Sequence, residues 1–319
     1  MASQLEKSIL ATVAYFDVFD YPLTLLELRR MLLGRHDVQH TLEDIQDVLA
    51  QSPLLSKAVR EKNGFLYARG REENVRERRT RFLVSREKFE RSRFALRLLS
   101  RMPFVRGLFV CNSLALENAT PKSDVDVAVV AKTGGAWWAR LFCLLLLSAL
   151  RRRPGQPGNK PKICLSFFVD EAHLDAAALR MSENDIDFAY WVANFYPVYD
   201  AGNCYERFWA ANQPWLLNVL PNARPIIPHP SRVMRHKPFF RMAGELLLAP
   251  LGACARAIQE KKFPAAIREL ANRDTRVRVE EGVLKFHVND RRIAHMELFV
   301  TRYESLLSLR GSEATEAIS

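Results

Sequence analysis

The amino-acid sequence predicts an α+β fold, and three observations support this class. Apolar side chains recur at the spacing of one helix face near the N-terminus, over residues 4–20. Short apolar runs of strand length, such as 105–110 and 124–131, occupy the middle of the chain. Two turn signals, Asn63-Gly64 and Glu281-Gly282, each lie between two strand candidates. With 319 residues, the chain is long enough for two or three domains.

The first domain is expected to cover residues 1–75 and to be mostly helical. After the helix over 4–20, two capping boxes place a Thr three positions before an acidic residue, and they predict helices over 24–33 and 41–49. Asn63-Gly64 then favours a tight hairpin, because both residues tolerate positive φ. Three helices followed by a hairpin resemble a winged-helix domain.

The third predicted helix indicates what such a domain does not bind. Winged helices often place this helix in the major groove of DNA. Here it carries Glu43, Asp44 and Asp47 and no Lys or Arg, so phosphates would repel it. A packing or partner-binding role is favoured over DNA reading, and duplex DNA is not an expected partner.

A basic helical connector is predicted over residues 76–103. The surrounding stretch, 71–106, holds 12 Arg or Lys and 5 Asp or Glu, a net charge of +7 out of +11 for the whole chain. One interpretation is a connector that attracts anions beside a nucleotide or polynucleotide cleft. The other is a solvated helix with ion pairs between residues one turn apart. The sequence leaves both open.

Residues 104–200 are expected to form a domain built on a mixed sheet with flanking helices. Its predicted strands and helices follow one another as strand (105–110), strand (124–131), helix (136–152), strand (162–169) and helix (184–195).

The C-terminal part is expected to be mostly helical over residues 201–310. Prolines interrupt its first half, and the stretch 221–238 holds too many of them for regular structure. A hairpin around Glu281-Gly282 and a final helix over 290–309 follow. The tail, 311–319, is expected to be disordered.

Cysteine usage and hydropathy favour a reduced, cytoplasmic protein without a membrane partner. The five cysteines are scattered and form no CxxC pair, so neither a zinc site nor a disulfide framework is indicated. The N-terminus lacks the basic-then-apolar pattern of a signal peptide. The richest apolar run, 141–150, is too short to span a bilayer and is typical of a core helix.

Asp124 and Asp126 are the residues most indicative of chemistry. They lie one residue apart in an apolar run, so both side chains should project from one face of a β-strand. Two carboxylates on one face repel each other, and a Mg²⁺ ion between them would remove that repulsion while leaving positions for phosphate. The alternative is that Lys122 or a nearby Arg neutralises one carboxylate without any catalysis.

The segment from Val110 to Asp126 resembles the signature of the polymerase-β-type nucleotidyltransferase superfamily. That signature is an apolar strand, Gly-Ser, about ten residues, and Asp-x-Asp within a second apolar strand. Ser113 matches the signature serine, and Asp124 and Asp126 match the metal-binding pair. The resemblance covers about residues 90–200.

The resemblance implies transfer of a nucleotidyl group from a nucleoside triphosphate to a hydroxyl. Mg²⁺ or Mn²⁺ would bind at Asp124 and Asp126, the nucleotide phosphates would lie at Asn112 and Ser113, and a third carboxylate on a later strand would complete the site. The acceptor, whether a small molecule, a protein side chain or an RNA end, is not specified by the sequence.

Three departures from the signature favour an alternative, a degenerate nucleotidyltransferase-fold protein that acts as a nucleotide-binding or regulatory module. Asn112 replaces the signature glycine, and Glu117 replaces a second glycine four residues after the serine. The later strand has Ser166 at its centre, so the third catalytic carboxylate is expected, if anywhere, at Asp170. Asp170 could equally be a cap at the strand end.

Overall fold

The computed structural model describes residues 3–34, 39–234 and 241–309, and it is an α+β protein in which about half of the residues are helical. The predicted α+β class is therefore confirmed. The expected disordered tail, 311–319, lies outside the described residues.

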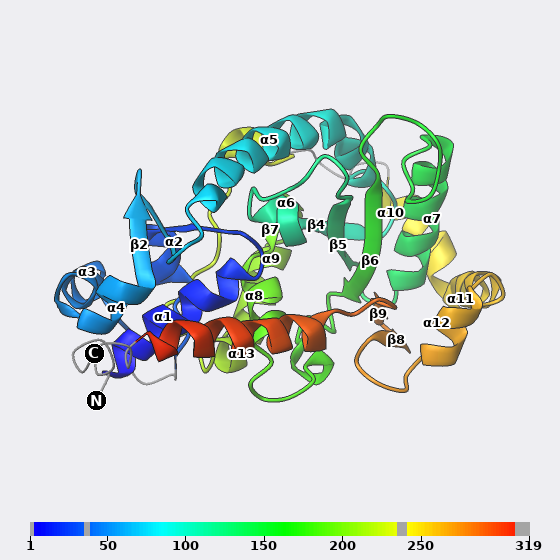
Figure 1. The fold of residues 1–319 in the computed structure, drawn as a ribbon. Helices are drawn as coiled ribbons and strands as arrows, with labels where there is room; N and C mark the ends of the chain where they lie inside the picture. The colour runs from blue at the N-terminus through cyan, green and yellow to red at the C-terminus, as the bar shows by residue number, and fades with distance from the viewer. Residues whose placement is uncertain (1–2, 35–38, 235–240, 310–319) are drawn as a thin grey trace, which may run out of the picture.

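Helices and a small antiparallel sheet make up the N-terminal part (Figure 1). Its sheet has the strand order β1-β3-β2. The hairpin is confirmed, since Asn63 and Gly64 have φ values of 55° and 79°. A fourth helix, which starts at the Ser52 cap with Pro53 in its first turn, was not predicted. The elements are α1 (Gln4–Asp17), β1 (Leu23–Thr24), α2 (Leu25–Arg30), α3 (Leu42–Gln51), α4 (Pro53–Ala58), β2 (Val59–Lys62) and β3 (Phe65–Ala68).

A mixed six-stranded sheet forms the centre of the protein, with the order β7-β4-β5-β6-β9-β8. Only β5 and β6 are parallel neighbours, and α7 (Ala136–Ala149) makes the crossover between them. The edge strand β7 was not predicted; its Pro197 is tolerated because an edge strand has one unpaired side. The strands are β4 (Val105–Val110), β5 (Val125–Ala131), β6 (Ile163–Asp170), β7 (Tyr196–Asp200), β8 (Val277–Glu280) and β9 (Val283–Phe286).

Two hydrophobic cores cover the two faces of this sheet. One contains side chains from α5 (Glu73–Leu99) and α7, together with Val125, Val127 and Val129 of β5. The other joins the opposite face of β5 to α8 (Ile186–Ala193), α9 (Cys204–Leu216) and the N-terminal helices. The long basic helix α5 therefore packs directly against the sheet, and in Figure 1 it passes over the end at which β5 and β6 begin.

The C-terminal part packs against both the central sheet and the N-terminal helices. The hairpin of β8 and β9 extends the central sheet through β6, and α13 (Arg292–Ser308) then runs back along α1 (Figure 1). Three further helices cover one end of the sheet: α10 (Arg241–Leu248), α11 (Gly252–Glu260) and α12 (Ala265–Leu270).

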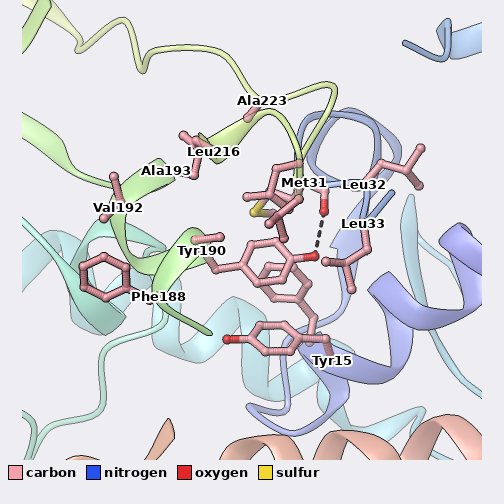
Figure 2. Close-up of a cluster of buried hydrophobic side chains, with 14 of the residues drawn as sticks. Tyr15, Met31, Leu32, Leu33, Phe188, Tyr190, Val192, Ala193, Leu216 and Ala223 are labelled. Carbon is pink, nitrogen blue, oxygen red and sulfur yellow. Dashed lines mark hydrogen bonds between the residues drawn. The ribbon is translucent and has the colours of Figure 1, made fainter. Parts of the chain in front are cut away.

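A cluster of aromatic and aliphatic side chains fixes the N-terminal part against α8 (Figure 2). The ring of Tyr190 stacks on that of Tyr15, with centroids 4.4 Å apart. Its hydroxyl donates a hydrogen bond to the carbonyl oxygen of Met31 at 2.8 Å. Because this polar contact is buried, separating the two parts would leave that carbonyl without its partner.

Candidate functional site

Asp124 and Asp126, which we call the carboxylate pair, lie at the start of the central strand β5. The strand begins at Val125, so Asp124 immediately precedes it and Asp126 is its second residue. Both side chains are only partly buried. The parallel neighbour β6 begins beside them, with Val125 opposite Ile163 and Asp126 opposite Cys164. The pair therefore lies at the end of the sheet where β5 and β6 begin, partly exposed to solvent.

The turn between β4 and the carboxylate pair has the backbone conformation that glycine favours. Asn112, which opens the short helix α6 (Asn112–Ala115), has a φ of 55°, and Glu117 has a φ of 52°. These are the two positions at which the nucleotidyltransferase signature has glycine. For a residue other than glycine, the left-handed region costs about 1–2 kcal/mol, and asparagine tolerates it best. At both positions the backbone has the conformation that glycine favours, although neither residue is glycine.

Asn112 connects this turn to the carboxylate pair. Its side-chain amide donates a hydrogen bond to Oδ2 of Asp126 at 2.9 Å. The backbone N–H of Cys111 donates to the carbonyl oxygen of Asp126 at 3.0 Å. The neighbouring Ser113 is partly exposed, and its hydroxyl makes no hydrogen bond within the described residues. Asn112 therefore helps to fix the orientation of Asp126, while the Ser113 hydroxyl remains available to a ligand.

Glu117 does not add a negative charge to the carboxylate pair. Its Oε1 lies 2.9 Å from Nη2 of Arg232, which neutralises it. Nη1 of Arg78 donates a hydrogen bond to the backbone carbonyl of Glu117 at 3.0 Å. The side chain is thus held by an arginine from the segment that follows α9.

The two carboxylates of the pair lack a neutralising ion pair. Across residues 3–34, 39–234 and 241–309, no Lys, Arg or His nitrogen lies within 4.0 Å of an oxygen of Asp124 or Asp126, so the alternative of a Lys122 or arginine partner does not apply. Burial and, to a smaller extent, the nearby Asp124 carboxylate raise the pKa of Asp126 to about 6, against the opposing effect of the Asn112 hydrogen bond.

Lys88 of α5 places its ammonium group at the loop that precedes Asp124. It is buried, and its ammonium group donates hydrogen bonds to the carbonyl oxygen of Thr120 at 2.6 Å and to the hydroxyl of Ser123 at 3.2 Å. Burial lowers the pKa of Lys88, and the Asp124 and Asp126 carboxylates oppose this shift. Lys88 thereby fixes the loop that leads into Asp124 without contacting the carboxylate.

Asp170 is not part of this site, so the expectation that it supplies the third carboxylate is corrected. It pairs with Ala131, five residues along β5 from Asp126, which is roughly 17 Å for an extended chain. Its oxygens accept hydrogen bonds from the backbone N–H groups of Gly134 at 2.8 Å and Ala172 at 3.0 Å, and one lies 2.7 Å from Nδ1 of His173. Asp170 therefore has the capping role at the strand end.

Cys164 and Ser166 occupy the part of β6 beside the pair. Burial, and then the charge of Asp126, raise the pKa of the Cys164 thiol to about 12, so it stays protonated at neutral pH. The Ser166 hydroxyl lies 3.2 Å from Nε2 of His287. Burial and the charge of Lys285 lower the pKa of His287 to about 3, so its imidazole is neutral. None of these groups supplies the negative charge of a third carboxylate.

The donor set fits one hard divalent cation. Among the described residues, no group of three or more His, Cys, Asp or Glu side chains is arranged to hold a metal ion. Mg²⁺, however, commonly binds through one or two carboxylates and fills its remaining positions with water and substrate phosphates. Two adjacent carboxylates without ion pairs, one of which has a raised pKa, are compatible with that mode of binding for Mg²⁺ or Mn²⁺.

Comparisons with known proteins return no match. No protein-family model matches the sequence, and no curated protein and no solved structure matches it. The resemblance to the nucleotidyltransferase signature therefore rests on the residues and geometry described above. Within the described ranges, no helix combines the length and apolar character needed to cross a membrane.

Proposed function

We propose that the protein is a nucleotidyltransferase of the polymerase-β type that transfers a nucleotidyl group from a nucleoside triphosphate to a hydroxyl. The observation that carries this proposal is the carboxylate pair at the start of β5, which has no ion-pair partner among the described residues and whose Asp126 accepts a hydrogen bond from the left-handed turn at Asn112. The sheet order, with one parallel pair that carries the carboxylates, supports a nucleotidyltransferase-type central fold.

In the proposed reaction, the acceptor oxygen forms a bond to the α-phosphorus and the bond between the α-phosphorus and the bridging oxygen breaks. Pyrophosphate leaves with that electron pair, and the hydroxyl proton passes to water. A divalent cation would neutralise phosphate charge at the site. Asp124 and Asp126 would hold it, the Asn112 amide orients Asp126, and the Ser113 hydroxyl is placed to donate to a phosphate oxygen.

The N-terminal part, residues 1–75, is proposed to be a winged-helix-like domain that does not read DNA. Helices α1, α2 and α3 followed by the hairpin of β2 and β3, and the strand order β1-β3-β2, support this assignment, although the additional helix α4 precedes the hairpin. Glu43, Asp44 and Asp47 of α3 are all exposed, and an exposed acidic helix is repelled by phosphates. The cytoplasmic location expected from the sequence remains part of the proposal, supported by five cysteines that are all free.

One observation favours the alternative of a nucleotide-binding or regulatory module without turnover. Cys164 and Ser166 stand beside the pair where the family would have its third carboxylate, and neither carries a negative charge. A site with two carboxylates is able to bind a metal–nucleotide complex and still lack the group that activates the hydroxyl.

Titration of the four nucleoside triphosphates with Mg²⁺ or Mn²⁺, followed by an assay for released pyrophosphate, tests the proposal. We expect Asp124→Ala and Asp126→Ala to abolish metal-dependent nucleotide binding, while Asp47→Ala, an exposed carboxylate on α3, leaves it unchanged. Unchanged affinity in both site variants would refute the metal site. Binding without pyrophosphate release in the presence of varied hydroxyl acceptors would support the regulatory alternative.

A further inference from the structure

The loop between α7 and β6, residues 151–162, is strongly basic and lies beside the carboxylate pair. It contains Arg151, Arg152, Arg153, Lys160 and Lys162 and no acidic residue. None of these five cations makes an ion pair within the described part of the chain. We call this segment the basic loop. Arg151, Arg153 and Lys160 are exposed, Lys162 is partly exposed and Arg152 is buried. The exposed part of the loop thus carries positive charge only, unlike an ordinary solvated surface with both signs interspersed.

Hydrogen bonds place the basic loop at the pair. The backbone N–H of Val125, between the two aspartates, donates to the carbonyl oxygen of Lys162 at 2.8 Å. The N–H of Ile163 donates to the carbonyl oxygen of Arg152 at 2.8 Å, which closes the loop at its base. The loop therefore ends next to Asp124, and Figure 1 shows it between α7 and β6, beside α5.

The basic loop is also joined to α5, in which Arg91 and Arg93 form ion pairs with Glu87 and Glu90. Nη2 of Arg152 donates to the carbonyl oxygen of Arg91 at 2.7 Å, and Nη2 of Arg91 donates to that of Asn159 at 2.7 Å. One turn further along α5, Phe94 is 64% exposed and stands between Arg91 and Arg97 at intervals of three residues. An aromatic ring that is exposed in this way between two arginines is able to stack on a base.

The positive charge around the pair exceeds what one nucleotide would require. The triphosphate would be compensated by its metal ion, whereas the basic loop, Lys88 and the exposed Lys122 supply further cations without acidic partners. Clustered positive charges together with an exposed ring match a single-stranded polynucleotide, whose phosphates would contact the cations and whose bases are unstacked. An acidic protein would not require the aromatic ring.

We infer that the basic loop and the adjoining face of α5 bind a single-stranded nucleic acid, and that its terminal hydroxyl is the acceptor of the reaction. This inference rests on the proposed function, because it assigns the substrate class of the same site. Binding of the strand along residues 151–162 would bring one end to Asp124 and Asp126. The geometry gives no role to duplex DNA.

Fluorescence anisotropy with a labelled 12-nucleotide RNA between 50 and 200 mM salt tests the inference. The variant removes Arg153 and Lys160 together (Arg153→Ala with Lys160→Ala), both of which are exposed and lack ion pairs. The control removes Lys261 and Lys262, an equally charged exposed pair that follows α11. Each single-strand phosphate contact contributes a factor of about 5 at 0.1 M salt, so the variant should bind about 25-fold more weakly, with a salt slope reduced by about 1.4.

The outcomes separate the inference from the proposed function. Equal loss in variant and control, no binding of single-stranded RNA or DNA, or equally tight binding of duplex DNA or polyglutamate would each overturn the inference. Metal-dependent nucleotide binding is measured on the same proteins without RNA. If it persists while RNA does not bind, only the acceptor assignment fails; if RNA binds but no metal–nucleotide complex does, the proposed function fails and the acceptor assignment falls with it.

Discussion

The ionised carboxylate of Asp126 destabilises the folded protein, so replacing it with a neutral side chain should increase the free energy of unfolding. Burial and the adjacent Asp124 raise its pKa from the ordinary value of 3.8 to about 6. Between these two values the folded protein retains a proton that the unfolded chain has released, so stability falls as the pH rises from about 4 to about 6. A rise from 3.8 to about 6 corresponds to about 3 kcal/mol above pH 6.

The substitution Asp126→Asn removes the charge and keeps the shape of the side chain. Because the carboxylate is partly exposed to water, we expect the variant to be about 2 kcal/mol more stable than the parent at pH 7.5 without metal, and within about 0.5 kcal/mol of it at pH 4. Urea denaturation at both pH values, with EDTA present, measures the difference. The exposed Asp47→Asn of α3 is the matched control and should show no such pH-dependent gain.

Addition of Mg²⁺ gives this prediction a second readout. A cation that binds the folded state stabilises it by RT ln(1 + [L]/Kd), so the parent should gain stability with Mg²⁺ and the Asp126→Asn variant should not. A variant that is less stable than the parent at pH 7.5, or a difference that does not change between pH 4 and 7.5, would refute the electrostatic reasoning. An equal Mg²⁺ effect in both proteins would refute the role of Asp126 in metal binding.

Two further predictions test the turn and the corrected role of Asp170. Asn112→Ala should destabilise the fold by about 1–2 kcal/mol, because alanine tolerates a φ of 55° poorly and cannot donate a hydrogen bond to Asp126. Asn112→Gly should cost less than about 1 kcal/mol, because glycine adopts this φ without strain. Urea titration measures both variants, and a glycine variant less stable than the alanine variant would contradict the prediction. Asp170→Ala should lower the free energy of unfolding by about 2–3 kcal/mol, because two backbone N–H groups lose their acceptor. Calorimetry of the folded variant should show an unchanged affinity for the Mn²⁺–nucleotide complex. Weaker binding of that complex would restore Asp170 as a candidate ligand.

The features that could be predicted from the sequence are those fixed by a few neighbouring residues. The capping box of Thr24 and Glu27 starts α2 as expected, and Asn63-Gly64 forms the predicted hairpin. The apolar run after Asp124 predicted strand β5, which the structure places at Val125–Ala131; that the two carboxylates project from one face stays a prediction. In each case the conformation depends on side-chain periodicity or on local hydrogen bonds within four residues.

The features that could not be predicted depend on contacts between distant segments. The strand β7 is defined by its pairing with β4, and its own sequence, which contains Pro197, is a poor strand signal. The role of Asp170 is set by the N–H of Gly134, 36 positions earlier in the chain, and the register of β6 shifts against β5 between Cys164 and Phe167, which alternation alone does not predict. The packing of α13 along α1 joins the two ends of the chain, and no local pattern encodes it.

The two residues of positive φ in the turn beside the carboxylate pair, Asn112 and Glu117, bear on whether this site binds a ligand. Backbone strain of this kind persists only where the surrounding structure enforces it. At Asn112 the amide contact with Asp126 offsets part of the cost, and at Glu117 the ion pair with Arg232 does so. Both contacts involve side chains that glycine does not have. The left-handed turn beside the carboxylate pair is thus held in place by contacts to Asp126 and Arg232, which favours a preorganised backbone at the proposed ligand site.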